Sequence, residues 1–148
     1  MDTVDDVTRS RMMSGIKSHH TKPELVIRSM LHGDGFRFRL HHKGLPGKPD
    51  LVLAKYRTAI FVHGCFWHVH EGCHYFKWPS TRVEFWAQKL KANQNRDKHK
   101  AEQILDMGWR VMIVWECATR DKSHHPELLN HMRDWLNQPE QGNYIEFP

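Results

Sequence analysis

The sequence lacks a long apolar run and has few cysteines, and both shortages narrow the class of protein. No apolar stretch approaches the roughly 18 residues of a membrane-spanning helix. The acidic start, MDTVDD, does not fit a secretory signal peptide. The three cysteines, Cys65, Cys73 and Cys117, cannot all pair within one chain. We therefore expect a cytoplasmic protein whose cysteines serve a metal site rather than disulfides.

The chain also lacks internal repeats, low-complexity tracts and linker-like stretches. Apolar residues make up 39% and charged residues 26% of the sequence, which argues against disorder. The 148 residues are long enough to bury a substantial core, and we expect one domain, 1–148.

The segment Thr8–Lys22 is basic and contains no acidic residue. It carries Arg9, Arg11, Lys17 and Lys22 in a chain of net charge +5. Contact with nucleic acid would explain this segment, and such binding would depend steeply on salt. On charge alone, a solvated helix face is the simpler explanation.

Hydrophobic periodicity and capping signals predict a mixed α/β fold. Helices are expected at residues 5–18, 21–33, 81–107 and 125–138. Two of them open with a capping-box pair, Thr21 with Glu24 and Thr81 with Glu84. Strands are expected in FRFRL, DLVLAKY, TAIFVHG and WRVMIVWEC. This order predicts a mixed central sheet flanked by helices.

The run His63–Pro79, HGCFWHVHEGCHYFKWP, places four histidines, two cysteines and five aromatic residues in 17 positions. Zinc takes four nitrogen or sulfur ligands in a tetrahedron, and thiolates select zinc over magnesium. His70 is the best fourth ligand, because the spacing Cys65-x4-His70-x2-Cys73 lets a short loop wrap one ion that Cys117 ties to the sheet. A closed site of this kind would be structural. Three unrelated cysteines are the alternative.

Four residues near this run are candidates for acid–base or metal chemistry. His63 and His68 are unclaimed by zinc, and a histidine can act as a general base near neutral pH, although a lone histidine is usually a surface or core residue. Asp50 begins the apolar strand PDLVL, where it could bind a hard cation or equally be a turn carboxylate. Glu24 is fully explained as a capping residue.

Phe66 and Trp67 occupy a part of the run that should be exposed. Most of the other large rings should be in the core. Adjacent exposed rings on a basic protein favour stacking on bases or wedging between base pairs.

Five segments occur in order over roughly residues 8 to 120: TRSRMMSGIKS, LPGKPDLVL, IFVHGCFWH, FKWPSTRVEFW and GWRVMIVWEC. Together they resemble the very short patch repair (Vsr) endonucleases, and HGCFWH followed by EFW and WEC is highly specific. The resemblance implies a fold of the type II restriction endonuclease class. It also implies a strand-specific nickase that cuts duplex DNA 5′ of the thymine of a T:G mismatch, which arises when 5-methylcytosine deaminates.

The resemblance further implies roles for single residues. Asp50 would bind catalytic Mg²⁺ together with the main-chain carbonyl of Val62, a position where family members can carry threonine. His68 would activate the attacking water, and His63 would contact the scissile phosphate. Glu24 would assist the metal site through water.

It also implies a structural zinc, a wedge into the DNA and a DNA-contacting arm. The zinc ligands would be Cys65, His70, Cys73 and Cys117, the wedge Phe66, Trp67 and Trp86, and the arm residues 1–20, with Arg9, Arg11 and Lys17 on the DNA backbone. One departure is HEGC, which has two residues between the zinc-site histidine and the next cysteine where some relatives have one.

The partners that the resemblance implies are a duplex DNA with a T:G mismatch, mismatch-repair proteins of the MutL type and, by function, a DNA cytosine-5 methyltransferase. We expect a monomer in the bacterial cytoplasm, associated with the nucleoid when bound.

Three other functions remain open. A non-catalytic, zinc-stabilised DNA-binding module would leave Asp50 and His68 without a task. A catalytic zinc hydrolase would need an open position on the metal. A restriction-fold nuclease without mismatch specificity would cut paired and mismatched duplexes alike, and would not require Phe66 and Trp67.

Overall fold

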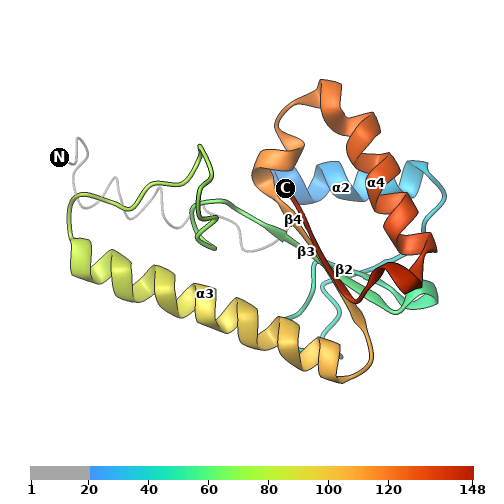
Figure 1. Ribbon diagram of the computed structural model, residues 1–148, viewed down its shortest axis with the longest axis horizontal. Coiled ribbons are helices and arrows are strands. Elements are labelled where there is room, and N and C mark those ends of the chain that lie inside the picture. The colour runs from blue at the N-terminus through green and yellow to red at the C-terminus, as the bar shows by residue number, and fades with distance from the viewer. Residues whose placement is uncertain (1–20) are drawn as a thin grey trace.

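The computed structural model describes residues 21–148, which form a mixed α/β fold (Figure 1). The helix expected at 5–18 and the basic arm at 1–20 lie outside these residues. At the centre is a five-stranded sheet of order β1-β2-β3-β4-β5. The strands are β1 (Arg39–Leu40), β2 (Leu51–Leu53), β3 (Thr58–His63), β4 (Arg110–Trp115) and β5 (Tyr144–Phe147). The first three pair antiparallel, whereas β4 pairs parallel with both β3 and β5, so the mixed sheet is confirmed.

Helices cover both faces of the sheet (Figure 1). The helices α2 (Lys22–Gly33) and α4 (His125–Asn137) lie on one face, and α3 (Val83–Asp106) lies on the other. Successive strand residues point to opposite faces, so β2, β3 and β4 each contribute to two cores. Leu51, Leu53, Ile60, Met112 and Val114 pack with α2 and α4. Val52, Ala59, Val111 and Ile113 pack with α3. Within residues 21–148 no helix is both long and apolar enough to cross a membrane.

One predicted helix cap is confirmed and the other is wrong. Thr21 has an extended backbone, and its hydroxyl accepts a hydrogen bond from the amide of Glu24 at 3.4 Å. The helix α3 instead begins after Arg82, whose φ of 48° is left-handed, and no side chain caps it. The chain thus enters α3 through a sharp turn, and Thr81 lies one residue too early to serve as the cap.

The observed strands are shorter than the predicted ones, most clearly in FRFRL and DLVLAKY, and one strand was not predicted. In FRFRL the burial alternates, but only Arg39 and Leu40 pair with β2. In DLVLAKY the strand β2 ends at Leu53, and a 3₁₀ turn, η1 (Ala54–Tyr56), leads to β3. The missed strand is β5, an edge strand of four residues near the end of the chain.

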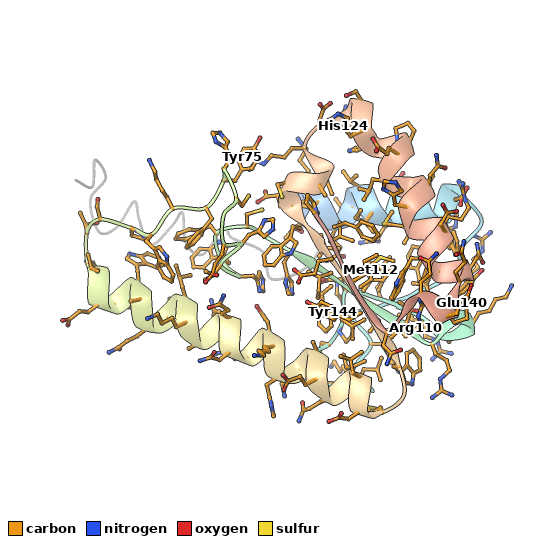
Figure 2. The ribbon with its side chains drawn as sticks, viewed as in Figure 1. Tyr75, Arg110, Met112, His124, Glu140 and Tyr144 are labelled. Carbon is orange, nitrogen blue, oxygen red and sulfur yellow. The ribbon has the colours of Figure 1, made fainter. Side chains whose placement is uncertain are left out.

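Arg110 is a buried cation at the start of β4, where it closes the end of α4 (Figure 2). Its guanidinium donates hydrogen bonds to the carbonyls of Trp135 at 2.9 Å, Gly142 at 3.0 Å and Gln138 at 3.4 Å. It also lies 3.5 Å from the centre of the Trp135 ring. Burial lowers the pKa of Arg110, and the carbonyls compensate the charge.

We expect Arg110→Met to lower the free energy of unfolding by about 2–4 kcal/mol, because three carbonyls lose a charged donor at once. Arg110→Lys should recover less than half of this loss, since an ammonium lacks the planar fork that reaches all three carbonyls. Urea unfolding measures both effects. Equal midpoints for Arg110→Met and the parent protein would contradict this role for Arg110.

Candidate active site

The parallel pairing of β3 with β4 brings two ligand-bearing segments together. His63 pairs with Trp115, so both strands end at the same edge of the sheet. The loop after β3 carries Cys65, His70 and Cys73. Cys117 lies in η2 (Glu116–Thr119), a 3₁₀ turn directly after β4, and not on the strand itself as predicted.

The four predicted ligands form one cluster. Their ligand atoms all lie within 4.8 Å of one another. The Nδ1 atom of His70 is 3.6 Å from the sulfur of Cys65 and 3.5 Å from that of Cys117. A tetrahedral zinc with ordinary bond lengths separates sulfur and nitrogen ligands by about 3.6 Å, so the cluster fits a closed site of this type.

The electrostatics of the cluster also favour a cation. Burial raises the pKa of the Cys65 thiol to about 12, and burial also raises the pKa of Cys117. Neither thiol would ionise at neutral pH by itself, whereas a bound metal stabilises the thiolates. The ring of His70 is fixed by parallel stacking on Trp115, with 4.1 Å between the ring centres.

Asp50 lies immediately before β2, in a cavity of about 190 Å³ that Val62 also lines. Its Oδ2 atom accepts a hydrogen bond from the Val62 amide at 2.7 Å. Burial, and to a lesser degree the neighbouring Glu24, raises the pKa of Asp50 to about 7, although the Val62 hydrogen bond opposes this shift. A carboxylate in this setting is stabilised by a cation, which favours metal binding over a turn role.

Glu24 has more contacts than a capping residue needs. Its carboxylate is almost fully buried and lies 3.4 Å from Arg28 and 3.1 Å from the Nε2 atom of His41. The same Nε2 atom is 3.9 Å from Asp50. Glu24, His41 and Asp50 thus form a second group that could hold a metal ion. His41 was not predicted from the sequence. The signal was the β1–β2 hairpin, because pairing of Leu40 with Leu51 places residue 41 opposite Asp50.

His68 has a carboxylate partner that was not predicted from the sequence either. Its Nδ1 atom is 2.5 Å from the Oδ2 atom of Asp97, on α3. One turn earlier on the same helix, the Asn93 side chain donates a hydrogen bond to the carbonyl of Trp67 at 3.1 Å. Asn93 and Asp97 lie four residues apart on one helix face, but no sequence signal identifies their partners, which lie 26 and 29 positions away.

His63 is buried and stacks on His68 with 3.9 Å between ring centres. Burial, assisted by the proximity of His68, lowers the pKa of His63 well below its ordinary value. His63 is therefore neutral at physiological pH, so it can donate one hydrogen bond but supplies no charge.

Asp50, His63, His68 and Asp97 all line the same cavity. Three cations line it as well: Lys48, Arg96 and Lys100. The cavity therefore combines a carboxylate suited to a metal, a histidine oriented by an acid, and positive charge suited to a phosphate.

The three predicted wedge residues are in mutual contact. The ring centre of Phe66 is 5.1 Å from that of Trp67 and 5.6 Å from that of Trp86, and the two tryptophans are 5.9 Å apart. Phe85 and Trp78, on the flanks of this group, are 43% and 45% exposed. The rings thus form a partly open aromatic cluster rather than a closed core. The predicted backbone contacts Arg9, Arg11 and Lys17 lie outside the described residues.

A mixed α/β fold with a carboxylate, a histidine–aspartate pair and three cations in one cavity suits the class of enzymes that hydrolyse phosphodiesters. Comparison with known proteins narrows this class. The family model for the DNA mismatch endonuclease Vsr matches residues 1–74. The chain is 43% identical to the DNA mismatch endonuclease Vsr of Escherichia coli K12, over 91% of this chain and 87% of that protein. It is 44% identical to the type II nicking enzyme V.XorIIP of Xanthomonas oryzae, over 90% and 97%. The chain belongs to the Vsr family and is a DNA endonuclease.

The cysteine cluster predicts a difference between two histidines of one loop. We expect His70→Ala to lower the zinc content of the purified protein well below one ion per chain and to reduce its melting temperature, since a closed site loses one of four ligands. His74→Ala is the matched control, because His74 is exposed and outside the cluster. Elemental analysis and thermal unfolding measure both. A full zinc complement in His70→Ala protein would exclude His70 as the ligand.

The raised pKa of Asp50 predicts a pH effect in magnesium-free, zinc-replete protein. Between about pH 4 and 7 the folded protein holds a proton on Asp50 that the unfolded chain has lost. The free energy of unfolding should therefore fall as pH rises through this window. Asp50→Asn removes this contribution. The free energy of unfolding of the variant, relative to that of the parent protein, should therefore rise by roughly 1–3 kcal/mol from pH 5 to pH 8. Urea unfolding of both proteins at pH 5 and pH 8 tests this. If the free energies of unfolding of the two proteins differ by the same amount at both pH values, the prediction is wrong.

Proposed function

We propose that the protein nicks duplex DNA on the 5′ side of the thymine of a T:G mismatch and so initiates very short patch repair of deaminated 5-methylcytosine. The observation that carries this proposal is the shared cavity, in which Asp50 lies with the pair His68 and Asp97. Family membership supplies the substrate class, and the residues of the cavity supply a mechanism.

His68 is the general base of the proposed reaction. Because Asp97 accepts a hydrogen bond from Nδ1–H, the free electron pair of the imidazole is on Nε2. Nε2 takes a proton from a water molecule as its oxygen bonds to the phosphorus, and the bond from phosphorus to the 3′ oxygen breaks. Asp97 positions the ring and stabilises the imidazolium that forms. The 3′ oxygen leaves as an alkoxide and takes a proton from solvent water, so the products carry a 5′ phosphate and a 3′ hydroxyl.

Asp50 would hold the catalytic metal ion, for which we propose Mg²⁺. When bound, the ion would offset the negative charge that develops on the phosphate and on the leaving oxygen. The Val62 amide fixes the Asp50 carboxylate at 2.7 Å, so the carboxylate is oriented before the substrate arrives. The Val62 carbonyl is the proposed second ligand, a role that requires no hydroxyl at this position. Glu24 adds a second negative charge beside Asp50.

The remaining groups of the cavity bind the DNA backbone. Lys48, Arg96 and Lys100 provide the positive charge for the scissile phosphate. His63, which is neutral, contributes a hydrogen bond to it. Arg9, Arg11 and Lys17 of the basic arm are proposed to extend this contact along the duplex.

The aromatic cluster is the proposed mismatch reader. Phe66, Trp67 and Trp86 would insert beside the T:G pair, where unstacking costs a few kcal/mol per step and a mismatch lowers that cost. A structural zinc bound by Cys65, His70, Cys73 and Cys117 would fix the loop that carries both the wedge and the base. Proteins of the MutL type and a DNA cytosine-5 methyltransferase are the proposed functional partners, and the protein would act as a monomer.

The decisive experiment is a magnesium-dependent nicking assay on labelled duplexes with T:G, T:A or C:G at one position. We expect a single nick 5′ of the mismatched thymine and little cleavage of the paired duplexes. His68→Ala should lower the rate by about 10²–10⁴, since it removes the base, and Asp50→Ala should abolish nicking while both variants still bind DNA.

Three results would overturn the proposal. Binding of the T:G duplex without cleavage would indicate a DNA-binding module. Equal cleavage of all three duplexes would indicate a nuclease without mismatch specificity. Parent-like turnover by His68→Ala or Asp50→Ala would remove the assigned residues.

A further inference from the structure

The group formed by Glu24, His41 and Asp50 extends the proposed metal centre. We propose that the imidazole of His41 is a nitrogen ligand in this centre, so that the site has mixed nitrogen and oxygen ligands and binds Mn²⁺ more tightly than Mg²⁺. This inference rests on the proposed metal role of Asp50 and adds a ligand and a metal preference to it.

The distances in the group fit an octahedral ion. The His41 Nε2 atom is 3.1 Å from each carboxylate oxygen of Glu24 and 3.9 Å from Asp50 Oδ1. Around an ion with ligands at about 2.1 Å, neighbouring ligands lie about 3 Å apart and opposite ligands about 4.2 Å apart. The three side chains can therefore share one ion after small adjustments.

The second oxygen of Asp50 is already engaged elsewhere. Oδ2 accepts the hydrogen bond from the Val62 amide, which leaves Oδ1 as the atom that faces His41. Glu24 and Asp50 come from α2 and from the start of β2, and His41 follows β1. Three separate elements thus direct one ligand atom each toward a common point. Such convergence is typical of a metal site and unusual for an incidental ion pair on the surface.

The backbone of His41 is held in an unusual conformation. Its φ of 47° is left-handed, a region that non-glycine residues seldom adopt, although histidine does so more often than most. Its amide donates a hydrogen bond to the carbonyl of Asp50 at 3.2 Å, which locks the two residues together. Strain of this kind persists where the surrounding structure needs one side chain in a fixed place.

The chemistry of imidazole determines which ion such a site prefers. Mg²⁺ binds oxygen ligands and retains water, whereas first-row transition ions also accept imidazole nitrogen. A histidine in place of a water or a carbonyl therefore favours Mn²⁺ over Mg²⁺. Mn²⁺ also competes poorly for thiolates, so it can probe this centre while zinc occupies the cysteine cluster.

The test is electron spin-echo spectroscopy of Mn²⁺ bound to the zinc-loaded full chain, combined with titration of Mn²⁺ and Mg²⁺. We expect the parent protein to show coupling of Mn²⁺ to an imidazole nitrogen. His41→Asn should remove this coupling and weaken Mn²⁺ binding on the order of tenfold, with little change for Mg²⁺. Asparagine is chosen because it tolerates the left-handed backbone.

His42→Asn is the matched control, since His42 is the next residue and belongs to none of the metal-ligand groups found in residues 21–148. It should keep both the coupling and the affinity. Circular dichroism and zinc content show whether each variant is folded.

The outcomes separate the inference from the function on which it rests. If Mn²⁺ binding persists in Asp50→Ala protein, the proposed metal centre itself is wrong. If binding depends on Asp50 but the nitrogen coupling is absent, or survives in His41→Asn, only the role of His41 is wrong, and His41 is then an ion-pair partner of Glu24.

Discussion

The parallel pairing of β3 with β4 is the constraint on which the rest of the site depends. Because the strands run in the same direction and His63 pairs with Trp115, both chains leave the sheet at one edge. This places Cys117 beside the loop that carries Cys65, and the sulfur atoms reach a common histidine. The antiparallel partner β2 begins at the same edge, so Asp50 enters the cavity below His63 and His68. A shift in register by one residue would turn His63 to the other face.

Buried charge is handled differently at the two ends of this sheet. At the start of β4, Arg110 makes hydrogen bonds to three carbonyls and is fully compensated within the chain. At the opposite edge, burial raises the pKa of Asp50 to about 7, with a second carboxylate beside it. The first arrangement stabilises the fold, whereas the second costs stability until a cation binds. The contrast explains why we interpret Arg110 as structural and Asp50 as functional, although both are ionisable and largely buried.

Local sequence signals predicted what depends on near neighbours. Thr21 caps its helix, and the spacing of Cys65, His70 and Cys73 within one loop predicted their proximity. His68 was already a candidate base from the residues alone, and the family resemblance gave it the role of activating the attacking water. The features that were not predicted, or were predicted wrongly, depend on the three-dimensional arrangement of the chain. Asp97 meets His68 across 29 positions, and nothing in the sequence around it identifies that partner. The strand β5 has only four residues, and its pairing with β4 is specified by the return of the chain after α4. Thr81 has the composition of a cap, but the left-handed turn at Arg82 displaces it.

The helix α3 links the proposed wedge to the proposed base. Asn93 holds the main chain at Trp67, and Asp97, one turn later, holds the imidazole of His68. Trp86, on the first turn of the same helix, contacts both Phe66 and Trp67. A rigid helix therefore contacts the loop at three points, two on the aromatic cluster and one on the base. Displacement of the rings by a base pair that resists unstacking would strain the same loop that orients His68. In the proposed mechanism, mismatch recognition and proton transfer therefore depend on the same helix.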